Sequence, residues 1–107
     1  MNESIEEITR CIDWYNRAKS ASPNDLVEVL RVISTHLYYL EGIRSEYKLK
    51  YERIIFNEVK EGNNVNRATN QAEVQVPELY LLRHIIGAAN RVCDAIRTQV
   101  SLLKKEM

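Results

Sequence analysis

The chain has 107 residues, a length that fits one domain, residues 1–107, with a single modest core. Fifteen Lys and Arg side chains balance fifteen Asp and Glu side chains, and this net charge of zero excludes a global attraction to nucleic acid or acidic membranes. Three glycines and two prolines are too few for the turns of an all-β fold, and an apolar content of 45% argues against a disordered chain.

The first predicted helix covers residues 4–20. Ser4 and Glu7 have the spacing of a capping box, in which each side chain satisfies a free backbone N–H of the first turn. Its apolar residues recur every three or four positions, which predicts one buried stripe: Ile5, Ile8, Ile12 and Tyr15. The N-terminus is acidic and lacks the apolar run of a secretion signal, so we expect a cytoplasmic protein.

The second predicted helix covers residues 23–61. Ser22 is the expected cap, and Pro23 suits the first helical position because its missing N–H has no partner there. Gly42 lowers helix propensity by about 1 kcal/mol relative to alanine, but the apolar pattern continues on both sides of it. The predicted buried stripe is Leu26, Leu30, Ile33, Leu37, Leu40, Tyr47, Tyr51 and Ile54.

The chain is expected to reverse at Gly62 and Asn63, because both residue types tolerate the left-handed backbone that ends a helix. A third helix follows over residues 64–105, and Pro77 should either kink it or divide it. Its predicted stripe is Val65, Ala68, Ala72, Val76, Leu79, Leu82, Ile86, Ala89, Cys93, Ile96, Val100 and Leu103.

A second apolar stripe beside the first on each long helix predicts where the first helix packs. The additional stripes, Val29 to Ile43 and Leu81 to Leu102, fall side by side if the chain reverses near Gly62. We therefore expect an all-α fold: a long antiparallel, coiled-coil-like hairpin, with the short N-terminal helix completing a three-helix bundle at the end that holds both termini. A thinner two-helix arm would extend from about Tyr47 to Gly62 and back to Pro77.

The predicted arm has more apolar side chains than its two helices can cover. Across the pair, Ile54, Ile55, Phe56 and Val59 would face only Val65, Ala68, Ala72, Val74 and Val76. This surplus, which includes Ile55, Phe56 and Val59, predicts a homo-oligomer in which a second copy covers them. Tyr38 and Tyr80 lie off the predicted stripes and are further candidate contacts, although an ordinary surface tyrosine is the favoured interpretation of each.

No sequence motif of a common enzyme class is present: there is no phosphate loop, GxSxG elbow, HExxH helix or calcium loop. His36 falls on an apolar stripe, where a packed imidazole is favoured over a ligand, and His84 has no metal-binding partner three or four residues away. Cys11 and Cys93 are expected to be reduced core residues, with a disulfide between them as the less favoured alternative. We expect no catalytic residues, no cofactor and no metal.

One basic segment is a candidate for nucleic-acid binding. Its positive charges alternate with Tyr47 and Tyr51, whose rings could stack on bases, but the stripe pattern favours packing for both tyrosines. Nucleic acid is therefore a partner that we do not favour, and no stretch reaches the roughly 20 apolar residues of a membrane span. The candidate nucleic-acid contacts are Arg44, Lys48, Lys50, Arg53 and Arg67.

The C-terminal third resembles small coil-containing proteins of tailed bacteriophages and prophages. The resemblance lies in the segment from Arg67 to Glu73, in Leu82-Arg83, and in the leucine-rich helix from Asp94 to Glu106, which ends in Leu-Lys-Lys-Glu. Genes of such proteins often lie near phage recombination and single-strand annealing genes, and the family has no assigned activity. The resemblance implies a phage or prophage helical protein, with interaction as its expected role and assistance in recombination or replication as the alternative.

Overall fold

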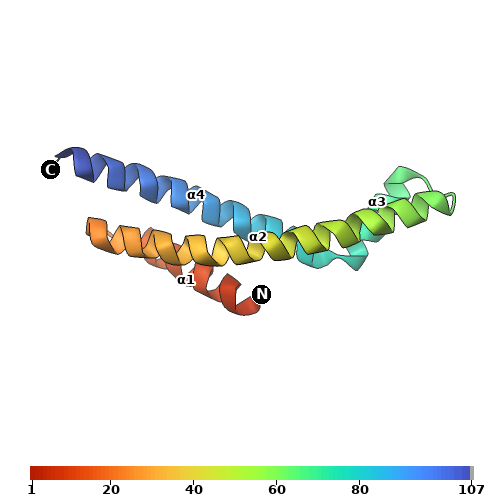
Figure 1. Ribbon diagram of the computed structural model, residues 1–107, viewed down its shortest axis with the longest axis horizontal. Coiled ribbons are helices and arrows are strands. Elements are labelled where there is room, and N and C mark those ends of the chain that lie inside the picture. Colours follow the sequence, from red (N-terminus) through yellow and green to blue (C-terminus); the bar gives the residue numbers. More distant parts are fainter. Residues whose placement is uncertain (107) are drawn as a thin grey trace.

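The computed structural model describes residues 1–106, which fold into four helices with no strand among them (Figure 1). The helices are α1 (Asn2–Arg17), α2 (Pro23–Lys60), α3 (Val65–Gln75) and α4 (Pro77–Glu106). The long helices pack as an all-α bundle, as the sequence predicts. No helix in the described range has the length and apolar content needed to cross a membrane.

The molecule is elongated, and α2 sets its length. Its dimensions are 64 × 25 × 20 Å, and its radius of gyration is 18.3 Å, well above the ~13 Å of a compact chain of about 100 residues. Helix α4 packs along the N-terminal half of α2 and α3 along the C-terminal half, so two shorter helices together line one long helix (Figure 1). The half of the molecule that contains α4 is therefore thicker than the half that contains α3, because α1 packs only beside α4.

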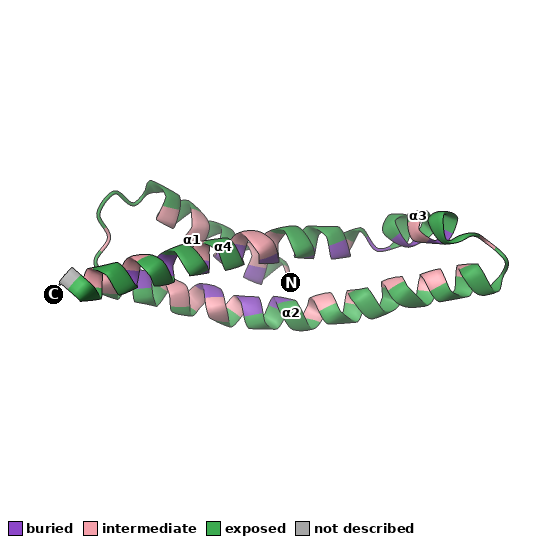
Figure 2. Cartoon of the chain, turned by 90° about the horizontal axis from the view of Figure 1, so that it is seen from above, coloured by how far each residue is buried: buried purple, intermediate pink, exposed green. Residues whose placement is uncertain are grey.

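The core is a single seam between α2 and the helices that return along it. On α2 the buried residues are Leu26, Ile33, Leu37 and Leu40. From α3 and α4 the core takes nearly the whole stripe predicted for residues 64–105: Ala68, Ala72, Val76, Leu79, Leu82, Ile86, Ala89, Cys93, Ile96 and Val100. Figure 2 shows this burial concentrated where α1, α2 and α4 meet, while the arm is largely exposed.

Helix α1 lies against both α2 and α4, with Ile8 fully buried between them. It runs back from the end that holds the C-terminus, so Met1 lies near the middle of the molecule and lines a hollow with Ile43 and Tyr47 of α2 (Figure 1). The three-helix section is thus only as long as α1. Leu81 and Leu102, at the two ends of the predicted second stripe, are 46% and 56% exposed.

The helix starts show which capping predictions were correct. The Ser22 side chain accepts a hydrogen bond from the Asp25 N–H at 3.1 Å, which confirms the predicted cap of α2. The capping box at Ser4 and Glu7 was wrong, because α1 already begins at Asn2 and has no side-chain cap. Ser4 therefore lies inside the first turn, where its hydroxyl faces α2 instead of a free N–H of its own helix.

The reversal after α2 has the predicted geometry. Gly62 has a φ of 98°, in the left-handed region that favours glycine, and the Asn64 side chain caps α3 by accepting from the Arg67 N–H at 2.8 Å. Of the two alternatives for Pro77, the structure has the division. Val76 leaves the helical conformation (φ −128°, ψ 63°), as expected for a residue before proline, and α4 begins at Pro77 itself.

In the arm, small residues allow α3 to approach α2. Ala68 and Ala72 are fully buried, and Ile54 and Ile55 on α2 are half-buried. The expectation that Val65 and Val74 also face α2 was wrong, since they are 61% and 77% exposed. Val65 is the first residue of α3, and Val74 lies on the opposite face of that helix from Ala68 and Ala72.

Candidate interaction surface

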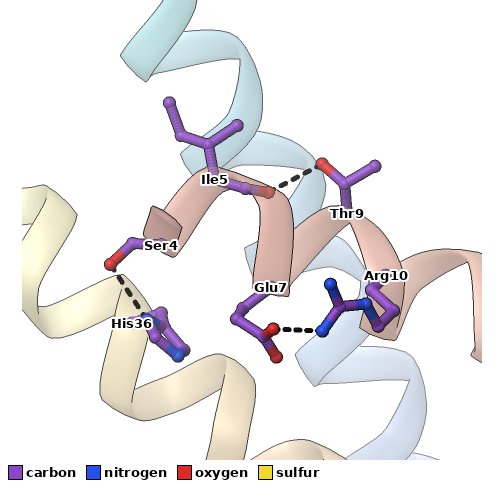
Figure 3. A network of polar contacts seen from close by, with 6 residues as sticks. All are labelled: Ser4, Ile5, Glu7, Thr9, Arg10 and His36. Atoms are coloured by element: carbon purple, nitrogen blue, oxygen red, sulfur yellow. Dashed lines mark hydrogen bonds and ion pairs between the residues drawn. The ribbon is translucent and has the colours of Figure 1, made fainter. Parts of the chain in front are cut away.

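One polar pair joins α1 to α2 inside the three-helix section. The Ser4 hydroxyl lies 2.9 Å from Nδ1 of His36, and both side chains are at least half-buried (Figure 3). Glu7 turns away from this pair and bonds to Arg10 on its own helix, as Figure 3 shows. A serine and a histidine act as nucleophile and base when a third group orients the imidazole, but no carboxylate hydrogen bonds to His36 in the described range. The pair is best explained as two polar groups that satisfy each other within the helix interface.

The two cysteines are free thiols on adjacent helices. Burial raises the pKa of the Cys93 thiol, and burial together with the nearby Glu7 carboxylate raises the pKa of Cys11. A raised pKa reduces the thiolate fraction, which is the nucleophilic form. Within residues 1–106, no three His, Cys, Asp or Glu side chains come together as a set that could hold a metal ion.

The candidate nucleic-acid contacts do not share one face. Lys48, Lys50 and Arg53 are exposed on α2, and Arg67 is exposed on α3, whereas Arg44 is half-buried against the core. Successive residues of a helix are rotated by about 100°, so Lys48 and Lys50 point in nearly opposite directions. The structure therefore spreads these charges around the arm instead of forming one phosphate-binding strip.

One hollow lies at the break at Pro77. It has a volume of ≈ 470 Å³ and combines aromatic, apolar and oppositely charged groups: Tyr51, Glu73, Val76, Pro77, Leu79, Tyr80 and Arg83. Tyr80, at 79% exposure, lies on its rim as an exposed residue, as the sequence predicted. A larger hollow of ≈ 750 Å³ is lined only by α1, including Trp14 and Arg17, and by its C-cap Ala18, so it is a groove between surface side chains of one helix.

Exposed apolar side chains gather on the face of α2 that points away from the other helices. Tyr38 and Phe56, both candidate contacts from the sequence, are 84% and 67% exposed, and Leu49 between them is 51% exposed. Positions 38, 49 and 56 differ by eleven and seven residues, so they fall within about 20° of one line along the helix. Val59 is 43% exposed to one side of this line, and Ile55 is half-buried.

Sequence reasoning missed part of this face. Leu49 had no predicted role, although its spacing from Tyr38 and Phe56 could have revealed it. The reason is that the strongest apolar pattern on α2 belongs to the core, and the weaker pattern that contains Leu49 becomes evident once the exposure of each residue is known. No family model, curated protein sequence or solved structure matches the chain. The fold and this surface therefore define only a class: an elongated helical bundle with an exposed apolar face on its longest helix.

Proposed function

We propose that this chain is a non-enzymatic helical interaction protein that works as a homo-oligomer. The observation that carries the proposal is the aligned exposure of Tyr38, Leu49 and Phe56 on the outer face of α2. Large apolar groups in water are unfavourable by about 25 cal/mol per Å² of apolar surface. Covering them with another protein surface recovers this free energy.

The hydrogen-bonded pair between α1 and α2 and the ion pairs within helices all serve structural contacts, which supports a structural role for the protein. The Ser4–His36 pair holds α1 on α2, and the ion pairs of the described residues, Glu7–Arg10, Glu28–Arg31 and Asp94–Arg97, are each formed within one exposed helical turn. Such exposed pairs contribute little to stability and are ordinary features of a solvated helix. The proposal therefore assigns function to surfaces and not to a chemical site.

The resemblance of residues 67–106 to phage coil proteins supplies the setting of the proposal: a phage or prophage protein that acts in the cytoplasm. The exposed helix faces suit such a role because extended helices present long surfaces to partners. Leu82, Ile96 and Val100, which lie in the segments that carry the resemblance, are buried in the core, so they support the fold more than a binding surface.

Sedimentation equilibrium over a wide concentration range tests the proposal, together with affinity capture from phage-infected cells. We expect self-association in the first measurement. A protein that remains strictly monomeric and also captures no partner would contradict the proposed function.

A nucleic-acid accessory role is the second candidate, supported by the exposure of Lys48, Lys50, Arg53 and Arg67 outside any ion pair of the described chain. Fluorescence anisotropy of labelled single- and double-stranded DNA at low and near-physiological salt tests it. Because these charges point in different directions, we expect no saturable binding at the higher salt. Saturable binding that weakens when Lys48, Lys50 and Arg53 are replaced together would favour the accessory role instead.

A further inference from the structure

A second heptad seam follows the outer face of α2. It consists of eight exposed residues that alternate spacings of four and three: Arg31, Thr35, Tyr38, Gly42, Ser45, Leu49, Glu52 and Phe56. We call this set the outer seam. Alternating spacings of three and four keep residues in line along a helix that pairs with another helix. The outer seam lies opposite the core seam of the same helix, so none of the other three helices covers it.

We propose that the outer seam pairs with the outer seam of a second copy in antiparallel orientation, with the two-fold axis between Ile43 and Arg44. This inference deepens the proposed function by naming the partner and the register. Under this symmetry, each residue faces the residue of the second copy for which the two numbers add to 87.

At the centre of this pairing, small residues allow the helices to approach closely. Gly42 faces Ser45 of the second copy, and an added Cβ at Gly42 would meet no heavy atom within 4 Å in the single chain. The Ser45 hydroxyl already bonds to the Glu41 carbonyl at 3.1 Å, so burial would not leave it without a partner. On either side, the Tyr38 ring packs against Leu49 of the second copy, and these two layers bury the most exposed apolar groups near the axis.

The outer layers also match chemically. Arg31 faces Phe56 of the second copy, an arrangement in which a guanidinium can lie over an aromatic ring. Thr35 faces Glu52 of the second copy, and its hydroxyl already bonds to the carbonyl of Arg31 at 2.9 Å. Each polar group in these layers therefore keeps a partner, either on its own helix or in solvent.

The charges that flank the seam select this register. Glu41 and Lys48 are exposed beside the outer seam. The pairing brings Glu41 of each copy close to Lys48 of the other copy, which gives two symmetric contacts between opposite charges. Sliding one helix by seven residues in one direction places Lys48 beside its own symmetry mate, and Glu46 likewise. Sliding it in the other direction places Glu41 beside its own mate and Glu28 opposite Glu52.

A parallel pairing is disfavoured by the same reasoning. It would place Arg31 opposite Arg31 and Glu52 opposite Glu52, and it would bring Glu41 beside Glu46 and Lys48 beside Arg53. Like charges in these positions repel, whereas the antiparallel register pairs unlike charges. Of these four arrangements, charge complementarity therefore favours the antiparallel one with its axis between Ile43 and Arg44.

The size of the seam sets the expected affinity. From Arg31 to Phe56 the strip is ~38 Å long and ~10 Å wide, on the order of 400 Å² per copy, which is below the ~800 Å² per partner of a standard interface. We therefore expect a reversible dimer whose population depends on protein concentration.

Charge reversal tests the register. Glu41→Lys and Lys48→Glu should each weaken dimerisation roughly tenfold in sedimentation equilibrium, because each creates two like-charge contacts, and the double variant should restore the wild-type constant. Lys50→Glu is the matched control, since it makes the same change of charge two residues away on a different face and should leave the constant unchanged. Single variants that dimerise as the wild type does, or a double variant that does not recover, would overturn the register.

Disulfide cross-linking gives a second measurement that is independent of charge. A mixture of Thr35→Cys and Glu52→Cys proteins should form a covalent heterodimer under mild oxidation, while each variant alone should not, because its two copies of the new cysteine would lie ~25 Å apart. The wild type is the control, since Cys93 is buried and Cys11 half-buried. Cross-linking of each variant with itself would instead indicate parallel pairing.

Different results would rule out the dimer interface and the interaction function. A dimer with neither the charge rescue nor the mixed cross-link would overturn this interface and leave the interaction function standing. A monomer at all concentrations with no captured partner would overturn the function itself.

Discussion

Individual residues are predictable from the sequence where one local interaction determines their role. Ser22 and Asn64 each cap a helix by accepting a hydrogen bond from a nearby backbone N–H, and the cap predicted at Ser22 was confirmed. Ser4 has the same local pattern, yet its hydroxyl bonds to His36, thirty-two residues away. The sequence could not reveal this contact, since it depends on the angle at which α1 packs on α2.

The Ser4–His36 contact leads to a prediction of stability. Ser4→Ala leaves the half-buried imidazole without its partner and should lower the free energy of unfolding by ~0.5–1.5 kcal/mol in urea denaturation. Thr9→Ala is the control, because the exposed Thr9 hydroxyl bonds only to a carbonyl of its own helix. Equal effects of the two substitutions would mean that the contact with His36 adds nothing.

The cysteines give a prediction about pH. Burial raises the pKa of Cys93 above its usual value in the folded state, so the folded protein holds this proton more tightly than the unfolded chain. Its contribution to stability is therefore complete below the ordinary thiol pKa and is lost as the pH rises through the raised value. We expect a thiol reagent at mildly alkaline pH to label Cys93 far more slowly than it does in urea. Equal rates would contradict the buried position.

Helices are predictable as elements, and their ends are less so. The spacing of apolar residues identified α2 as a helix. Both of its ends were predicted to within one residue, because the Ser22 cap and the turn at Gly62 mark them. The sequence left open how Pro77 acts, because a proline permits either a kink or a division, and the packing of α3 against α2 decides between them. Val65 and Val74 were misplaced because valine suits both a buried face and an exposed one in a short helix.

The cap of α2 can be tested on its own. Ser22→Ala removes the acceptor for the Asp25 N–H and should lower the free energy of unfolding by about 1 kcal/mol. Ser20→Ala, in the preceding loop, is the control and should change stability by less than about 0.5 kcal/mol. If Ser22→Ala matched the control in thermal and urea unfolding, the cap would not contribute to stability.

For the whole molecule, the sequence predicted the core far better than the surface. The core follows from periodicity, whereas the outer seam of α2 becomes visible only when exposure is known for each residue. Leu40 and Leu49 show the difference: they are nine residues apart on α2, and they are 0% and 51% exposed. Leu40 therefore stabilises the fold, and we assign Leu49 to self-association.

This contrast yields a paired prediction. Leu40→Ala should lower the free energy of unfolding by ~2–5 kcal/mol because it opens a cavity in the core. Leu49→Ala should change the unfolding of the monomer by less than about 1 kcal/mol, and it should weaken self-association. Chemical denaturation at low concentration measures the first effect, and a comparable loss of monomer stability in both variants would contradict the division of roles.

The most direct test of the central claim is sedimentation equilibrium of the wild type beside Leu49→Ala across micromolar to millimolar concentrations. We expect a wild-type monomer–dimer equilibrium that shifts toward monomer in the variant, with both proteins equally folded by circular dichroism. A wild type that stays monomeric throughout, or a dimer that Leu49→Ala leaves unchanged, would contradict the claim that the outer face of α2 is where this protein associates.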